Sequence, residues 1–227
     1  MTTSTSTPSN HAEHFGHEPS FLLTHLLATI STSIIPLTTS AVSRGCKVFG
    51  ASILSKSTLS PIVSATNDEM TSPLLHGETN TLLQFHAHNA ALPADQRVDP
   101  KDCIFLSTHE PCSLCLSAIT WSGFDNFYYC FTYEDTKQLF AIPHDLRILR
   151  EVFQTQKSEE GKEEVLYNKK NAYWSSYSLE ELIEQSPEGE REALRVKLEA
   201  VKREYNSLSE TYQQSKSAQL PGQIPLA

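Results

Sequence analysis

Two short motifs constrain this chain more than any other part of its sequence. The first is His76-Gly77-Glu78, and the second is Pro111-Cys112-Ser113-Leu114-Cys115. An imidazole and two thiolates are ligands that zinc prefers, and three such ligands leave the fourth corner of a tetrahedral site open for water. We therefore expect a fold that brings His76, Cys112 and Cys115 together around one Zn2+ ion.

Both motifs are expected at the beginning of a helix. A short buried strand is predicted over 103–107, and Pro111 then fixes the backbone for a helix over 112–122. The positive end of that helix favours the thiolate form of the cysteines. A second helix is predicted over 76–88, with His76 in its first turn. Two helix N-termini that meet at one point would supply the three protein ligands.

Glu78 is predicted to be the catalytic residue. Within a helix, residues i and i+2 do not face each other, so His76 and Glu78 can share a pocket only at a helix start or an irregular turn. An acid beside a zinc-activated water can take up a proton and deliver it to a leaving amine. This combination is typical of zinc deaminases of nucleobases. The alternative interpretation of Glu78 is a capping or solvated acid.

A structural zinc site would instead need a fourth protein ligand. His109, just before the second motif, is the strongest candidate for that ligand. Cys103 and Cys130 fall within predicted strands and are expected in the core. His11-Ala12-Glu13 repeats the pattern of the first motif, but it lies in a Ser/Thr-rich tail, so no role is expected for it.

The length of 227 residues fits one domain with appendages better than two domains. We predict a disordered tail over 1–17, a zinc-dependent domain over 18–155, a helical C-terminal extension over 156–215 and a loose tail over 216–227. Within the domain, strands and helices follow one another in the order strand-strand-helix-strand-helix-strand-helix. This order predicts an α/β fold, with helices on both faces of a mixed sheet.

The C-terminal extension contains two further patterns. An apolar stripe at helical spacing predicts a helix that packs on the domain or across a dimer. Its residues are Leu194, Leu198, Val201, Tyr205, Leu208 and Tyr212. Before it lies an aromatic segment that either covers the pocket as a lid or packs on the domain surface. The members of this segment are Tyr167, Tyr173, Trp174 and Tyr177.

Composition limits the partners and the compartment. The chain has 27 acidic and 18 basic residues, a formal net charge of −9. Phosphate binding needs clustered Lys and Arg, so a nucleic-acid partner is disfavoured, whereas a small nucleobase or nucleoside is not. Five cysteines without a secretory signal favour a reducing compartment, and we expect a cytoplasmic protein. The apolar segment over 21–35 is expected to be too short and too polar to span a membrane.

The two motifs and their surroundings resemble the cytidine and deoxycytidylate deaminase superfamily. The resemblance rests on Leu75-His76-Gly77-Glu78-Thr79-Asn80-Thr81-Leu82 and on Ser107-Thr108-His109-Glu110-Pro111-Cys112-Ser113-Leu114-Cys115. The His-Gly-Glu form is similar to the fungal cytosine deaminase branch. The resemblance implies a three-layer α/β/α fold with a five-stranded mixed sheet, to which this chain adds N- and C-terminal helices. It also implies the same three zinc ligands, Glu78 as proton shuttle and a homodimer.

The resemblance further implies how a substrate is held. Asn67 is the counterpart of an Asn that hydrogen-bonds the substrate in many members, although it could also be a turn-forming residue. Backbone groups of Gly77 and Thr108 are expected to contact the base edge. The expected reaction converts an exocyclic amine of a free nucleobase or nucleoside, of cytosine, cytidine or guanine type, to a carbonyl and releases ammonia. The alternatives are a protein like the tRNA adenosine deaminases and a non-catalytic zinc-binding interaction module.

Overall fold

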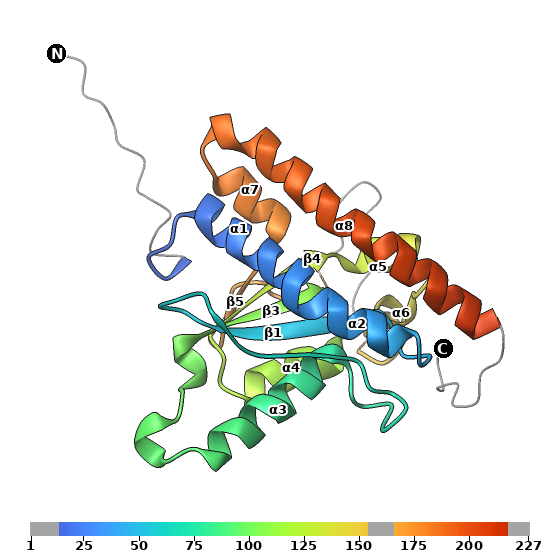
Figure 1. The fold of residues 1–227 in the computed structure, drawn as a ribbon, viewed down its shortest axis with the longest axis horizontal. Coiled ribbons are helices and arrows are strands. Elements are labelled where there is room, and N and C mark those ends of the chain that lie inside the picture. Colours follow the sequence, from blue (N-terminus) through green and yellow to red (C-terminus); the bar gives the residue numbers. More distant parts are fainter. Residues whose placement is uncertain (1–13, 154–165, 218–227) are drawn as a thin grey trace.

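The computed structural model describes residues 14–153 and 166–217 of the chain. Its centre is a five-stranded sheet in the order β2-β1-β3-β4-β5. Helices α3 and α4 lie on one face of the sheet, and α1, α2, α7 and α8 lie on the other (Figure 1). This three-layer α/β/α arrangement, with extra helices from both ends of the chain, confirms the predicted fold class.

The sheet is mixed because it combines a hairpin with parallel strands. β1 (Gly50–Ser55) pairs antiparallel with β2 (Pro61–Thr66) and with β3 (Cys103–His109). β3, β4 (Asn126–Phe131) and β5 (Ser175–Ser178) are parallel. β3 begins where the buried strand over 103–107 was predicted. β5 comes from the aromatic segment of the C-terminal extension, so that segment completes the sheet.

The helices that carry the two motifs form one layer. α3 (Gly77–Ala91) and α4 (Ser113–Trp121) pack against each other and against the sheet. The core beneath them is aromatic and aliphatic, and removal of this surface from water stabilises the layer. Its fully buried members are Ala51, Ile53, Phe85, Cys103, Phe105, Ile119, Phe127 and Tyr129. As expected, Cys103 is a core residue.

The opposite layer begins with one long helical run. α1 (Pro19–Thr29), a π-helical turn (Ile30–Ile34) and α2 (Ile35–Val42) follow one another without a break. Pro36 lies in the first turn of α2, where its missing N–H is tolerated, so the helical run continues through it.

By length and composition, the run Pro19–Val42 is the one helix in the described ranges that could cross a membrane. The expectation that this segment is too short is therefore wrong. Its apolar side chains nevertheless pack into the protein: Leu22, Leu23, Leu26 and Ile30 are fully buried. The core helix of a soluble protein passes the same test, so the run is weak evidence for a membrane span.

α7 (Leu179–Gln185) and α8 (Glu188–Ser217) complete this layer. All six residues of the predicted apolar stripe are buried where α8 packs on the rest of the domain. The stripe is therefore a packing surface within the chain. Part of the predicted N-terminal tail is also packed: His14 is buried, and its Nδ1 lies 2.9 Å from Tyr128 Oη. The motif copy over 11–13, the loop over 154–165 and the tail over 218–227 lie outside the described residues.

Two short helices follow β4 and frame the site. α5 (Tyr133–Phe140) begins with a capping box formed by Thr132 and Asp135, and α6 (His144–Glu151) contacts α4. Two 3-10 turns, Ala94–Gln96 and Pro100–Asp102, connect α3 to β3.

Candidate metal centre and active site

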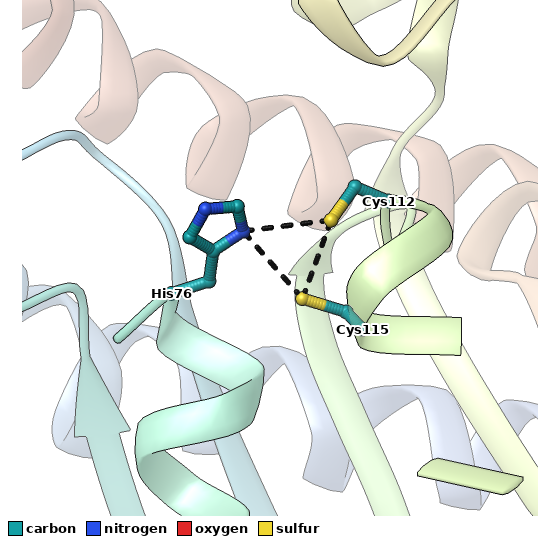
Figure 2. Close-up of side chains that lie close together, drawn as sticks. All are labelled: His76, Cys112 and Cys115. Atoms are coloured by element: carbon teal, nitrogen blue, oxygen red, sulfur yellow. Dashed lines mark hydrogen bonds between the residues drawn. The ribbon is translucent and has the colours of Figure 1, made fainter. Parts of the chain in front are cut away.

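The three predicted metal ligands come from the first turns of two helices (Figure 2). His76 is the N-cap of α3 and Cys112 is the N-cap of α4, and both have extended backbone angles. Neither side chain caps its own helix. The imidazole and the thiol are therefore available to face each other, with Cys115 in the first turn of α4 beside them. This confirms that the two helix starts meet at one point.

The distances between the three side chains fit a zinc ion. His76 Nδ1 lies 3.5 Å from Cys112 Sγ and 3.7 Å from Cys115 Sγ, and the two sulfur atoms are 3.5 Å apart (Figure 2). A tetrahedral zinc ion with ordinary zinc–sulfur and zinc–nitrogen bonds would separate such ligand atoms by about 3.6 to 3.8 Å. In the described part of the chain, this is the group of His, Cys, Asp and Glu side chains that could hold a metal.

The protonation of the three ligands also suits a cation. Burial lowers the pKa of His76, but its hydrogen bond to Cys112 and the negative charge of that sulfur raise the pKa to about 9. The hydrogen bond between the two thiols lowers the pKa of Cys112, whereas burial raises the pKa of Cys115. The cluster thus favours a thiolate beside a protonated imidazole. A divalent cation can take the place of these protons.

Glu78 follows His76 and Gly77 in the sequence, and its side chain lies beside the metal ligands. Its side chain is only 4% exposed, and its Oε2 lies 3.4 Å from Cys115 Sγ. Its Oε1 accepts a hydrogen bond of 3.0 Å from Ser107 Oγ. Burial, and then the charge of Cys112, raise the pKa of the Glu78 carboxyl. A buried carboxyl that holds its proton readily is suited to proton transfer at the metal.

His109 does not approach the three ligands. Its ring stacks on Phe131 at 4.7 Å between centroids, and Phe49, Phe140 and Tyr205 meet it edge-on. Nδ1 lies 3.0 Å from Thr108 Oγ1. His109 is thus held in an aromatic box, and the structural zinc site that used it as fourth ligand is not formed.

A cavity of about 340 Å³ opens beside the metal ligands. His76, Cys112 and Glu78 form part of its wall, and Asp145 from α6 forms another part. The Asp145 carboxyl has no hydrogen-bond partner among the described residues. Burial, and then the charges of Cys112 and Glu78, raise the pKa of Asp145 to about 7. The sequence offered no signal for Asp145, because only the fold brings α6 to the cavity.

The three predicted substrate contacts do not line this cavity. Asn67 is fully buried: its Oδ1 accepts from the N–H of Gly77, and its Nδ2 donates to Glu69. Thr108 Oγ1 both accepts from the N–H of Gly50 and donates to its carbonyl, at 3.0 Å each. Asn67 and Thr108 therefore hold the start of α3 and the start of β1, and a direct contact with substrate stays a prediction for all three residues.

The aromatic segment packs on the domain. Trp174 and Tyr177 are buried, Tyr173 is exposed, and Tyr167 donates a hydrogen bond to Glu110. None of these four residues lines the cavity. The described structure thus favours the packing interpretation over the lid.

The comparisons with known proteins agree with the site. Residues 34–131 match the family described as the cytidine and deoxycytidylate deaminase zinc-binding region, and this stretch contains both motifs. No curated protein sequence matches the chain.

The solved structures similar to this chain include two guanine deaminases and a tRNA deaminase. A guanine deaminase from Bacillus subtilis is 24% identical, with 60% of this chain and 80% of that chain covered and a TM-score of 0.45. A guanine deaminase from Nitrosomonas europaea is 15% identical, with 91% of this chain and 97% of that chain covered and a TM-score of 0.45. A structure of tRNA:A34 deaminases is 18% identical, with 45% of this chain and 77% of that chain covered and a TM-score of 0.34. These scores carry no argument about the substrate. Residues 34–131 thus carry the zinc-binding region of the cytidine and deoxycytidylate deaminase family, and His76, Cys112 and Cys115 within it are a ligand set that fits a zinc cofactor.

Proposed function

We propose that this protein is a hydrolytic deaminase of a free nucleobase or nucleoside, of cytosine, cytidine or guanine type. His76, Cys112 and Cys115 hold the zinc ion, and Glu78 moves the protons. The observation that carries the proposal is the position of the buried Glu78 carboxyl, 3.4 Å from Cys115 Sγ and in the wall of the same cavity as His76 and Cys112. A non-catalytic zinc module has no use for a carboxyl at this place.

The residues account for the proton transfers of the reaction. Zinc, when bound, supplies a water of lowered pKa. The reaction consumes this water and the amine, and yields a carbonyl and ammonia. The Glu78 carboxylate takes the proton that the attacking water loses and delivers it to a ring nitrogen of the substrate. It then carries the remaining hydroxyl proton to the amine, so that the carbonyl forms and ammonia leaves. The raised pKa of Glu78 suits the second step, since the carboxyl must hold the proton in between.

Ser107 lets Glu78 exist in both protonation states. Its hydroxyl has a single proton but lies within reach of two acceptors, Glu78 Oε1 at 3.0 Å and the carbonyl of His109 at 2.6 Å. When Glu78 is charged, Ser107 donates to it. When Glu78 carries a proton, it can donate to Ser107, which then donates to the carbonyl. Glu78 therefore keeps its hydrogen bond with Ser107 in both protonation states.

Asp145 supports a substrate with several N–H donors. A cavity of about 340 Å³ is of the size that takes a small ligand. A carboxylate in its wall can accept two neighbouring N–H groups at once. Guanine offers a ring N–H next to an amino group, so within the proposed range Asp145 favours the guanine type. The exchange Asp145→Asn should then lower kcat/KM for guanine more than for cytosine.

The test is ammonia release by the zinc-loaded protein from a panel of bases, nucleosides and nucleotides. Glu78→Gln should retain stoichiometric zinc and lose activity by about 100- to 10,000-fold. Glu188→Gln, the same change at an exposed position, is the matched control and should stay active. Activity that survives in Glu78→Gln would contradict the proton-transfer role. If the zinc-loaded wild type released ammonia from no member of the panel, the proposed reaction would be contradicted.

Homodimer formation and a cytoplasmic location belong to the same proposal. The described structure has five cysteines that are buried and form no disulfide, as expected in a reducing compartment. Light scattering of the purified protein at several concentrations would test the dimer, and a fluorescent fusion would test the compartment.

A further inference from the structure

The segment that carries Tyr167 and Trp174 lies outside the residues that match the family, yet it bonds to both ends of α4. At the entry to α4, Tyr167 Oη donates to Glu110 Oε1 at 2.7 Å. Near the last turn, Trp174 Nε1 donates to Thr120 Oγ1 at 2.8 Å. α4 begins with two of the three metal ligands. The C-terminal segment thus holds the helix on which the metal centre depends.

Glu110 connects this segment to the metal ligands. It is 8% exposed, and both of its carboxylate oxygens have a donor: Oε1 accepts from Tyr167, and Oε2 accepts from the N–H of Tyr133 at 3.0 Å. Its own N–H donates to the carbonyl of Phe131 at 2.7 Å. The Tyr133 hydroxyl donates to the carbonyl of Pro111. The two residues before Cys112 are therefore fixed by hydrogen bonds.

Tyr167 is the one member of this network that comes from the C-terminal segment. Its ring packs edge-on against Tyr133 and Trp174, at 6.3 and 5.9 Å between centroids. Without the Tyr167 hydroxyl, Oε1 of this buried carboxylate would lose its donor at 2.7 Å, and Glu110 would keep only its hydrogen bonds with Tyr129 and the N–H of Tyr133. Loss of one donor to a buried charged acceptor is costly, so Glu110 would turn toward the water of the cavity and move the turn that precedes Cys112.

We propose that Tyr167 is a positioning residue of the metal centre: through Glu110, it holds the turn that presents Cys112, and so slows the loss of zinc. Groups that orient metal ligands from outside the coordination sphere commonly change metal affinity. The inference rests on the zinc ligands of the proposed function, but not on the identity of the substrate. It also gives the C-terminal extension a role at a site to which it contributes no ligand.

The test measures zinc transfer from the full-length, zinc-loaded protein to a chromogenic chelator in excess. Tyr167→Phe, which removes only the hydroxyl, should release zinc about 10-fold faster than the wild type. The matched control is Tyr173→Phe, the same change in the same segment at a side chain that is 69% exposed. It should release zinc at the rate of the wild type. In the cobalt-substituted protein, Tyr167→Phe should also shift the thiolate-to-metal absorption, which reports the sulfur positions.

A double variant separates positioning from general loosening of the fold. If Tyr167 acts through Glu110, then Tyr167→Phe combined with Glu110→Gln should release zinc no faster than the worse of the two single variants. The metal-free Tyr167→Phe protein should also unfold at nearly the same temperature as metal-free Tyr173→Phe. Two results would overturn the inference. One is a double variant whose zinc-release rate rises by the product of the two single effects, and the other is an equal rate of zinc release from Tyr167→Phe and Tyr173→Phe.

The zinc readout also distinguishes this inference from the proposed reaction. A protein that holds zinc in a Tyr167-dependent way but releases no ammonia contradicts only the reaction. A protein that deaminates its substrate but loses zinc equally from Tyr167→Phe and Tyr173→Phe contradicts only the role of Tyr167. A wild-type protein that binds no zinc overturns both.

Discussion

Gly77 and Gly50 meet backbone to backbone where α3 begins. A Cβ atom on Gly77 would lie 2.6 Å from Gly50 Cα and 2.9 Å from the carbonyl carbon of Phe49. Carbon atoms in contact are ordinarily about 3.5 to 4.0 Å apart, so no side chain fits at Gly77 unless β1 or α3 moves. The glycine between His76 and Glu78 thus lets the start of α3 lie directly on β1. This close contact between α3 and β1 fixes how deeply the side chains of His76 and Glu78 lie in the site.

The first prediction concerns this contact. Gly77→Ala should lower the free energy of unfolding by about 1 to 3 kcal/mol, because the atoms that a methyl group would meet are backbone atoms. It should also weaken zinc binding, since His76 and Glu78 move with α3. Urea denaturation and zinc titration would measure the two effects. Gly189→Ala is the control: a Cβ there meets nothing within 4 Å, so stability should not fall. Wild-type stability and zinc binding in Gly77→Ala would contradict the close approach.

The second prediction concerns the hydroxyl that serves Glu78. Ser107→Ala removes the donor to Glu78 Oε1 and should lower kcat by about 10-fold, as expected for a bond to a charged group that is worth roughly 1.5 kcal/mol. KM and zinc content should change little, because Ser107 is neither a metal ligand nor part of the cavity wall. Ser57→Ala, in the exposed turn between β1 and β2, is the control. A change in KM with no change in kcat would show that Ser107 acts on binding instead.

The sequence was sufficient to predict the metal centre because its signals are local. His76, Cys112 and Cys115 each lie at a predicted helix start, so a fold that brings the two helix starts together also brings the three ligands together. The apolar run predicted over 103–107 is the beginning of β3 (Cys103–His109), and the helix start at 76–77 is as expected. Helix and strand bounds of this kind depend on neighbouring residues, and so they can be inferred from neighbouring residues.

Other features depend on contacts between distant parts of the chain. β5 (Ser175–Ser178) has no apolar alternation and becomes a strand by pairing with β4. Asp145 and Tyr167 reach the site only because α6 and the C-terminal segment fold back on α4. The sequence left Asn67 as a substrate-binding or turn-forming residue, whereas in the structure its side-chain amide hydrogen-bonds to Gly77 and Glu69. No pattern within a short window of the sequence contains this information.

The third prediction concerns the thiols after zinc removal. Cys46, Cys103 and Cys130 are buried, and burial raises the pKa of Cys103 and of Cys130 to about 12. Cys112 is 8% exposed, and its hydrogen bond with Cys115 lowers its pKa. In the chelated, folded protein, Cys112 should therefore react first with a disulfide reagent, because the thiolate is the reactive form.

The measurement is the time course of thiol modification before and after chelation. The zinc-loaded protein should react slowly, and the chelated protein should show a fast phase that is absent from Cys112→Ser. The three core cysteines should react only on unfolding. A fast phase that persists in Cys112→Ser would mean that another thiol is accessible and that the metal does not protect Cys112.

The fourth prediction concerns the buried imidazole of His109. Burial lowers the pKa of His109 to about 3, and its Nε2 has no hydrogen-bond partner among the described residues. In the unfolded chain, a histidine has a pKa of about 6.5. Between these two values, the unfolded chain binds a proton that the folded protein does not bind. Acidification therefore favours unfolding, and stability from this group is complete above about pH 6.5 and is lost as the pH falls toward 3.

His109→Phe should remove this dependence. Phenylalanine fills a similar volume in the aromatic box and takes away the unsatisfied nitrogen, so we expect the variant to be about as stable as the wild type at pH 7. Below pH 6.5, the wild type should lose about 1.4 kcal/mol per pH unit more than the variant, or about 2 kcal/mol by pH 5. Urea denaturation of both metal-free proteins at pH 7 and pH 5 measures this difference, and the zinc ligands, common to both proteins, cancel from it. Parallel pH dependence in the two proteins would mean that His109 becomes protonated in the folded state, and that the aromatic box admits water.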